Sequence, residues 1–183
     1  AYDRGVRLEP RAGSEVLAWA VRPYFERSWR RFCSHAHTPP EGTRYAPAVV
    51  RLGRVAWMAH PMFGMYARHT MPEYRELVLR CLDRVCPDRL VRHDGPRSIQ
   101  AHLRRHGARW LLHVLHFIPE RRGTSQEVVE DPLPIHRVRF AVRVPATSVE
   151  WVGEGSVAGV SAMDGVVEFE VREAVGHGLA VLA

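Results

Sequence analysis

The chain has 183 residues, of which 46% are hydrophobic and 25% are charged, a composition typical of a folded globular protein. The formal net charge is +6, but all 26 basic residues are scattered arginines without the basic, aromatic-interleaved stripe that indicates nucleic-acid binding. The sequence has no run of about 18 apolar residues. We therefore expect neither a nucleic-acid partner nor a membrane span.

The cysteines also limit the interpretation. Cys33, Cys81 and Cys86 are an odd set whose spacing matches neither zinc ligands nor a disulfide framework. Together with an N-terminus that does not resemble a signal peptide, they favour reduced thiols and a cytoplasmic location. The chain begins at Ala1 without an initiator methionine, which suggests a fragment or a processed form of a longer gene product.

The first half of the chain predicts strands. Residues 5–9 form a short apolar–polar run that is typical of an edge strand. Residues 16–21 are nearly continuous in apolar side chains, which predicts a strand buried on both faces. Residues 48–52 and 54–58 flank Gly53 and predict a hairpin.

A helix over residues 72–85 has the strongest pattern. Its apolar positions recur at helical spacing and form one stripe: Tyr74, Leu77, Val78, Cys81, Leu82 and Val85. Thr70 followed by Glu73 predicts a capping box, with Pro72 in the first turn. Pro87 ends the helix.

From Asp94-Gly95-Pro96 onward the pattern becomes one of short strands, so we place a domain boundary between residues 93 and 94. Asp164-Gly165 predicts a hairpin turn, and residues 121–134 predict a polar loop. The predicted strands cover residues 98–105, 109–118, 138–144, 149–152, 157–161, 167–172 and 179–182. This spacing indicates an antiparallel β-sandwich.

Histidines are the main candidates for a site. His60 ends a predicted strand just before Pro61, at the position where open α/β sheets usually bind ligands. His35 and His37 lie in an irregular segment over residues 24–45 and share one side of any extended backbone. With His60 nearby, the three imidazoles and a water would suffice for Zn²⁺. A polar contact to a substrate or a neighbouring domain, and ordinary loop histidines, are the alternatives.

Other polar residues favour structural roles. His113 and His116 have opposite parity on one strand, so they cannot act on one face. Glu130 and Asp131 are adjacent, whereas glycosidase carboxylates face each other across about 5–10 Å. We interpret the two acids as turn or ion-pair residues.

Several stretches together point to a family: residues 23–25, 27–29, 32–39, 53–66, 112–122, 130–131 and 176–177. Across them the chain resembles the C-terminal portion of bacterial glycoside-hydrolase-like proteins. In these proteins a catalytic TIM barrel precedes an amidotransferase-like domain, akin to the trimerisation domain of bacterial beta-galactosidases, and then a small β-sandwich. Gly53, Val55, His60 and Pro61 match the Gly-x-Val-x-Gly-x-Gln-x-His-Pro-Glu type segment of class I glutamine amidotransferase-like domains.

This resemblance departs from the family at one important position. Met62 stands where the family has an acid, and nothing upstream supplies a nucleophile elbow. A catalytic triad needs a nucleophile and a group that orients the histidine. We therefore expect His60 to be non-catalytic.

The resemblance implies an α+β fold, with a partial amidotransferase-like (flavodoxin-like) α/β part over residues 1–93 and an antiparallel β-sandwich over residues 94–183. A (β/α)₈ barrel needs about 200 residues or more, so the catalytic barrel would be a missing N-terminal partner. The chain would then be a non-catalytic accessory and oligomerisation region of a glycoside hydrolase, contacting carbohydrate through the parent enzyme, with no cofactor and in a homo-oligomer.

Candidate residues for the rim of the active site or an inter-domain contact are Ser34, His35, His37, His60 and Tyr66. Two alternatives remain. One is a carbohydrate-binding module, although Trp110 and Trp151 fall in apolar strands, which favours core packing over sugar stacking. The other is a small metal hydrolase that uses His35, His37 and His60.

Overall fold

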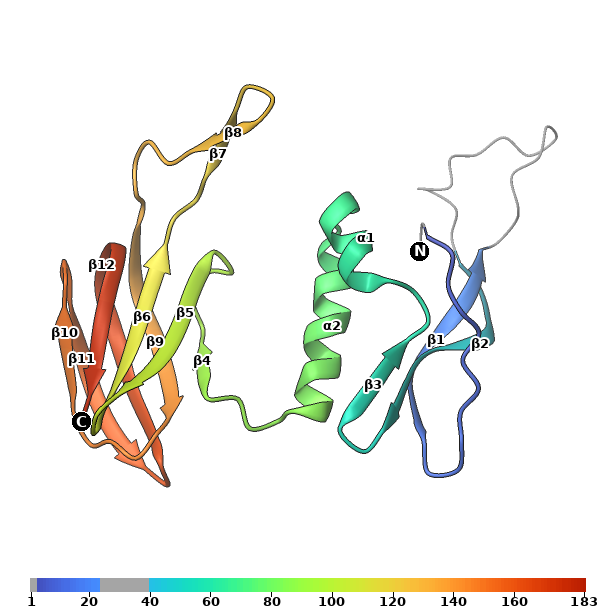
Figure 1. Ribbon diagram of the computed structural model, residues 1–183, viewed down its shortest axis with the longest axis horizontal. Helices are drawn as coiled ribbons and strands as arrows, with labels where there is room; N and C mark the ends of the chain where they lie inside the picture. The colour runs from blue at the N-terminus through green and yellow to red at the C-terminus, as the bar shows by residue number, and fades with distance from the viewer. Residues whose placement is uncertain (1–2, 24–39) are drawn as a thin grey trace. The chain divides into compact units, whose positions relative to one another are not determined.

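The computed structural model describes residues 3–23 and 40–183, which form two compact units, Ala1–Asp88 and Arg89–Ala183 (Figure 1). We call them the first unit and the sandwich unit and describe each by itself.

The first unit consists of a small sheet and two helices. β1 (Glu15–Pro23), β2 (Pro40–Leu52) and β3 (Val55–Met58) pair in the order β1-β2-β3, and every pairing is antiparallel. The predicted hairpin around Gly53 is confirmed, because β2 and β3 pair from Leu52 and Val55 outward. α1 (Met62–His69) and α2 (Pro72–Val85) follow β3.

The expected amidotransferase-like (flavodoxin-like) α/β part is wrong. The described residues are mostly β, all their strand pairs are antiparallel, and none of the parallel βαβ crossovers that define that fold is found among them. β1 is an edge strand with Trp19 43% exposed, so the expectation of burial on both faces also fails. Residues 5–9 form no strand, although the Val6 amide donates to the Ala59 carbonyl at 2.7 Å.

The predicted helix over residues 72–85 is confirmed, but its capping box is wrong. Met71 is the N-cap of α2, and it makes no side-chain cap hydrogen bond. Thr70 instead ends α1 in the left-handed conformation, with φ 50°, and its amide donates to the Tyr66 carbonyl at 2.8 Å. Thr70 therefore serves as the C-cap of α1, a helix that the sequence did not predict, and is not the N-cap of α2.

The sandwich unit has a β-rich, sandwich-like fold in which one long strand is shared. The first half of β12 (Val166–Leu182) pairs with β9 and β11, and the second half pairs with β6 and β10. We call the array β4-β9-β12-β11 the β9 sheet and the array β5-β6-β12-β10 the β6 sheet. The bounds are β4 (Val91–His93), β5 (Ile99–His106), β6 (Arg109–His116), β9 (Pro134–Arg143), β10 (Val149–Val152) and β11 (Gly155–Met163).

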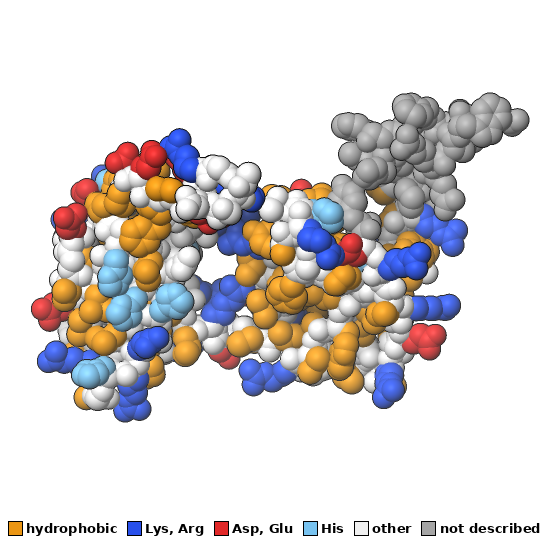
Figure 2. All heavy atoms as spheres, turned by 45° about the horizontal axis from the view of Figure 1, so that its top comes forward, with side chains coloured by type: hydrophobic (Ala, Val, Ile, Leu, Met, Phe, Trp, Pro, Cys, Tyr) orange, Lys and Arg blue, Asp and Glu red, His pale blue; other side chains and the backbone are white. Residues whose placement is uncertain are grey.

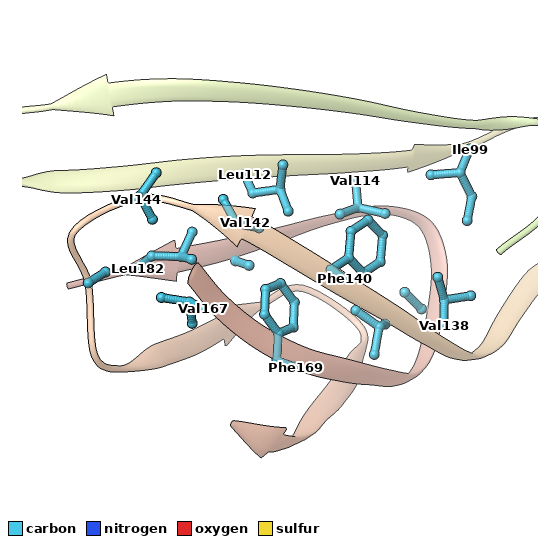
Figure 3. Packing of buried hydrophobic residues seen from close by; sticks show 14 of the residues in the cluster. Ile99, Leu112, Val114, Val138, Phe140, Val142, Val144, Val167, Phe169 and Leu182 are labelled. Atoms are coloured by element: carbon cyan, nitrogen blue, oxygen red, sulfur yellow. The ribbon is translucent and has the colours of Figure 1, made fainter. Parts of the chain in front are cut away.

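Alternating apolar residues of both arrays meet in the core (Figure 3). Phe140 of β9 and Phe169 of β12 stack with ring centroids 5.6 Å apart, and Leu112 of β6 is fully buried. The alternation in the predicted strands over residues 138–144 and 167–172 is therefore confirmed, because polar partners such as Arg139 and Glu168 lie on the outer face.

Two details of the sandwich differ from expectation. The predicted strands over residues 167–172 and 179–182 are parts of the single strand β12, which passes through Gly176 at φ 63°. The predicted polar loop contains a projecting hairpin of β7 (Glu120–Arg122) and β8 (Gln126–Val128) (Figure 1). Neither helix of the described residues is long and apolar enough to cross a membrane.

We predict that Phe140→Ala destabilises the sandwich unit by about 3–5 kcal/mol, because it removes a 1%-exposed ring that stacks on Phe169 and leaves a cavity. Urea denaturation followed by circular dichroism measures the change. Met163→Ala, which truncates a 75%-exposed side chain of the same unit, should change stability by less than about 0.5 kcal/mol. Equal effects of the two substitutions would contradict the core assignment.

Candidate functional site

The candidate site lies where β3 meets α1, at residues 59–62, and we call it the His60 corner. Ala59 is buried, and its amide donates to the Ala48 carbonyl of β2 at 2.8 Å. The Met62 amide then donates to the His60 carbonyl at 2.8 Å, which turns the chain tightly into α1. These two backbone hydrogen bonds therefore fix the main chain at His60, from which its side chain extends.

The His60 ring is held by the N-terminal segment. Its Nδ1 lies 3.0 Å from the Asp3 carbonyl oxygen. Because a carbonyl can only accept a hydrogen bond, Nδ1 carries the proton, and in the neutral ring Nε2 is left as an acceptor. Gly5 packs on the same ring, since a Cβ there would lie 2.7 Å from His60 Cε1. Partial burial lowers the pKa of His60 below its ordinary value of 6.5.

The corner opens into an apolar groove of about 320 Å³. Trp57 and Phe63 line it and are 51% and 73% exposed. Met62 is 6% exposed and packs in the small core of the unit with Met65 and Val78, so it offers no group that could orient an imidazole. Cys81 also lines the groove, but burial raises the pKa of its thiol, which disfavours the nucleophilic thiolate.

An ion cluster fixes the sheet to α2. Glu15 of β1 accepts from Arg51 of β2 at 3.1 Å and from Arg84 of α2 at 2.6 Å. The hydrogen bond from Arg51 and the charge of Arg84 lower the pKa of the Glu15 carboxyl. All three side chains are substantially exposed, so these ion pairs add little to the free energy of unfolding. Their main effect is to fix how α2 lies on the sheet.

The five candidate residues fall into two groups. His60 precedes α1, and Tyr66, which is 39% exposed, lies within that helix. Ser34, His35 and His37 lie outside the described residues, so the structure does not show whether they approach His60. Within residues 3–23 and 40–183, no group of three or more His, Cys, Asp or Glu is arranged to hold a metal ion.

The structure confirms that His113 and His116 cannot act together, because they lie on opposite faces of β6. His116 is buried at 5% exposure, with Nδ1 2.9 Å from the Leu133 carbonyl and Nε2 2.9 Å from Ser98 Oγ. Glu130 is an ion-pair residue, as predicted, because it accepts from Arg122 at 2.9 Å on an exposed part of the chain.

Sequence reasoning missed a row of histidines on the outer face of the β6 sheet. His102 lies opposite His113 in the β5–β6 register, and His113 Nδ1 lies 3.1 Å from Nε2 of His177. Figure 2 shows histidines gathered on this unit. Burial first, and then His177, Arg104 and His102, lower the pKa of His113. A hairpin at Gly107 could have predicted that His102 and His113 lie opposite each other. His177 could not have been placed beside them, because it comes from a distant strand.

Comparison with known proteins shows a likeness to a solved structure. No family model and no curated protein matches the chain. Among solved structures, the fold is similar to a region of a glycoside hydrolase, which supports a β-rich, glycoside-hydrolase-related chain.

That structure is alpha-L-fucosidase isoenzyme 2 from Paenibacillus thiaminolyticus, with 26% sequence identity and a TM-score of 0.77. The match covers 92% of this chain and 26% of the fucosidase, so the chain spans about a quarter of that protein's length. The likeness does not support the expected amidotransferase and trimerisation domain types.

We predict that the His60 imidazole titrates below pH 6.5 in NMR, because the fold favours its neutral form. A folded-state pKa below the unfolded value means that protonation favours unfolding. Stability is therefore lost as the pH falls from the unfolded pKa through the folded one. The thermal midpoint should fall more steeply between pH 7 and pH 5 in the wild-type chain than in His60→Gln.

Titration of His60 at or above pH 6.5 would contradict the partly buried, Asp3-bound ring. A steeper slope in His60→Gln than in the wild type would contradict the direction of the linkage.

Proposed function

We propose that this chain is a non-catalytic accessory and oligomerisation region of a glycoside hydrolase that acts on carbohydrates, and that it rims the active site of a catalytic barrel. The observation that carries the proposal is the fold likeness to an alpha-L-fucosidase, which covers nearly all of this chain but about a quarter of that enzyme. A region that occupies this share of a larger enzyme leaves most of that enzyme's length for the reaction itself.

The His60 corner supports a non-catalytic role. Triad chemistry needs a nucleophile and an orienting acid beside the histidine. Among the residues that line the groove with His60, Met62 is buried and apolar, and burial raises the pKa of the Cys81 thiol, so neither residue supplies an orienting acid or a ready nucleophile. His60 instead donates from Nδ1 to the Asp3 carbonyl and packs against Gly5. These contacts hold the N-terminal segment in place.

The exposed surface of the first unit supports assembly. Trp57, Phe63 and Leu82 line the groove and are all more than 40% exposed, and Figure 2 shows apolar side chains gathered on this unit. Contiguous exposed apolar surface marks interaction sites. β3 is also an edge strand of the sheet that the structure describes, and an edge strand is a template for pairing with another chain. In the proposal this face packs in the oligomer, and His60, Tyr66, Ser34, His35 and His37 contribute to the rim.

The 183-residue chain should not hydrolyse 4-nitrophenyl α-L-fucopyranoside or 4-nitrophenyl β-D-galactopyranoside, because the proposal assigns the chemistry to another domain. Release of nitrophenolate measures turnover. Turnover that persists after replacement of His35, His37 and His60 would overturn the accessory role and would also exclude a histidine-metal site. Turnover lost with those histidines would overturn the accessory role in favour of the metal hydrolase.

The chain should also self-associate, and Phe63→Glu should shift it towards monomer, because a charge in the groove face opposes burial of that face. Sedimentation velocity measures the distribution. Met163→Glu places the same charge at a 75%-exposed position of the sandwich unit and should leave association unchanged. A monodisperse wild-type monomer would contradict oligomerisation through this face.

A further inference from the structure

A hollow of about 730 Å³ lies on the outer face of the β9 sheet. Its volume falls within the range of about 300–1,000 Å³ that is usual for small-molecule sites. The strand register places its residues in rows across the sheet. Ala141 pairs with Arg92 on one side and with Glu168 on the other, and Glu168 in turn pairs with Ser161.

Side-chain size explains why this face is hollowed. Small residues, among them Ala141, Ala158 and Ser161, form the floor, and long charged side chains rise around them. The floor is widened by an irregularity of β11 between Ala158 and Ser161, where Gly159 has φ 61° and nothing lies within 4 Å of its Cβ position. Bulges of this kind often lie next to binding sites.

The hollow is polar and its charges balance. Arg92, Arg139 and Arg172 contribute three positive charges, and Asp94, Glu168 and Glu170 contribute three negative charges, so the formal sum is zero. The aromatic residues among those that line it, His93, Phe140 and Phe169, belong to the inward-facing positions of their strands, and Phe140 and Phe169 are at most 2% exposed. A ligand here would be held by hydrogen bonds and not by ring stacking.

The spacing of these groups suits hydroxyl ligands. Arg139 Nε and Glu170 Oε2 are 3.9 Å apart, too far for a direct hydrogen bond. A hydroxyl that bridges the two groups from the solvent side would accept from the guanidinium and donate to the carboxylate, since a hydroxyl does both. Asp94 is fixed nearby, because its Oδ1 accepts from the Arg139 amide at 2.8 Å. Alternating donors and acceptors on a rigid sheet are therefore matched to a molecule that carries several neighbouring hydroxyls.

We infer that the outer face of the β9 sheet binds a neutral carbohydrate through the guanidinium and carboxylate groups around the Ala141 floor. The charge balance favours a neutral sugar over an acidic one, because an anion would meet as many carboxylates as guanidiniums. Many polyhydroxylated molecules would fit this description, and the choice of a sugar among them rests on the proposed function. It gives the sandwich unit the role of holding substrate or product glycan beside the enzyme.

Calorimetric titration of the 183-residue chain with L-fucose, lactose and D-galacturonate tests this inference. We expect saturable binding of at least one neutral sugar and weaker binding of galacturonate. Ala141→Trp fills the floor from the outer face and should weaken the neutral sugar at least tenfold. Glu170→Gln keeps the shape, removes one charged acceptor and should weaken it several-fold. Gln100→Trp, on the exposed outer face of the β6 sheet, is the matched control and should bind as the wild type does.

Circular dichroism and the thermal midpoint confirm that each variant is folded. If Ala141→Trp does not fold, Ser161→Trp on the edge strand β11 blocks the same floor and is expected to give the same loss. Absence of saturable binding of L-fucose and lactose by the wild type would overturn the inference, as would binding unchanged in the floor variants or tighter binding of galacturonate.

A different result would overturn the accessory role, namely turnover of an aryl glycoside by the chain alone. Loss of sugar binding without turnover would remove the site on the β9 sheet and leave the accessory role standing.

Discussion

The sandwich unit depends on a single strand that is hydrogen-bonded in both of its sheets. β12 gives its first half to β9 and β11 and its second half to β6 and β10, so its backbone joins the two layers covalently. Two glycines make this possible. Gly176 takes φ 63°, a conformation that favours glycine, and Gly178 leaves room for the Trp151 ring, which a Cβ would meet at 1.9 Å. The histidine row and the polar hollow are consequently anchored to the same element.

The His60 corner shows how packing can occupy a position where chemistry would be expected. A histidine after a strand and before a helix suggests a site, yet its ring nitrogen is bound by a main-chain carbonyl and the next residue is a buried methionine. Placing an acid at residue 62 would bury a carboxylate among Met65 and Val78, which costs several kcal/mol unless a partner is supplied. The apolar core of the small unit and an orienting acid at this position are therefore incompatible.

Local patterns predicted much of the fold, and non-local relations account for the failures. The helix over residues 72–85, the Gly53 hairpin and the alternation around Phe140 follow from periodicity and turn chemistry within one segment. The α/β expectation failed because a strand–histidine–helix sequence does not specify strand direction, which the β1–β2 pairing sets. The predicted capping box was wrong because Thr70 is the C-cap of α1 and so cannot be the N-cap of α2. The hollow could not be predicted, since its floor joins Ala141 to Ser161 through the register of three strands.

The two outer faces of the sandwich differ in how much hydrogen-bonding capacity they retain. On the β6 sheet, His113 and His177 bind each other at 3.1 Å, so part of the hydrogen-bonding capacity of these two rings is already satisfied, and their neighbours Leu111 and Leu115 are half-buried. On the β9 sheet, Arg139 and Glu170 stay 3.9 Å apart above a floor of small residues and remain able to bind additional groups. A hydroxyl that bridges this pair from the solvent side breaks no direct hydrogen bond between the two groups, because each group exchanges a contact with water for a contact with the hydroxyl. The same pair in direct contact would have to be broken first, which is why we assign the proposed sugar site to the β9 sheet and not to the β6 sheet.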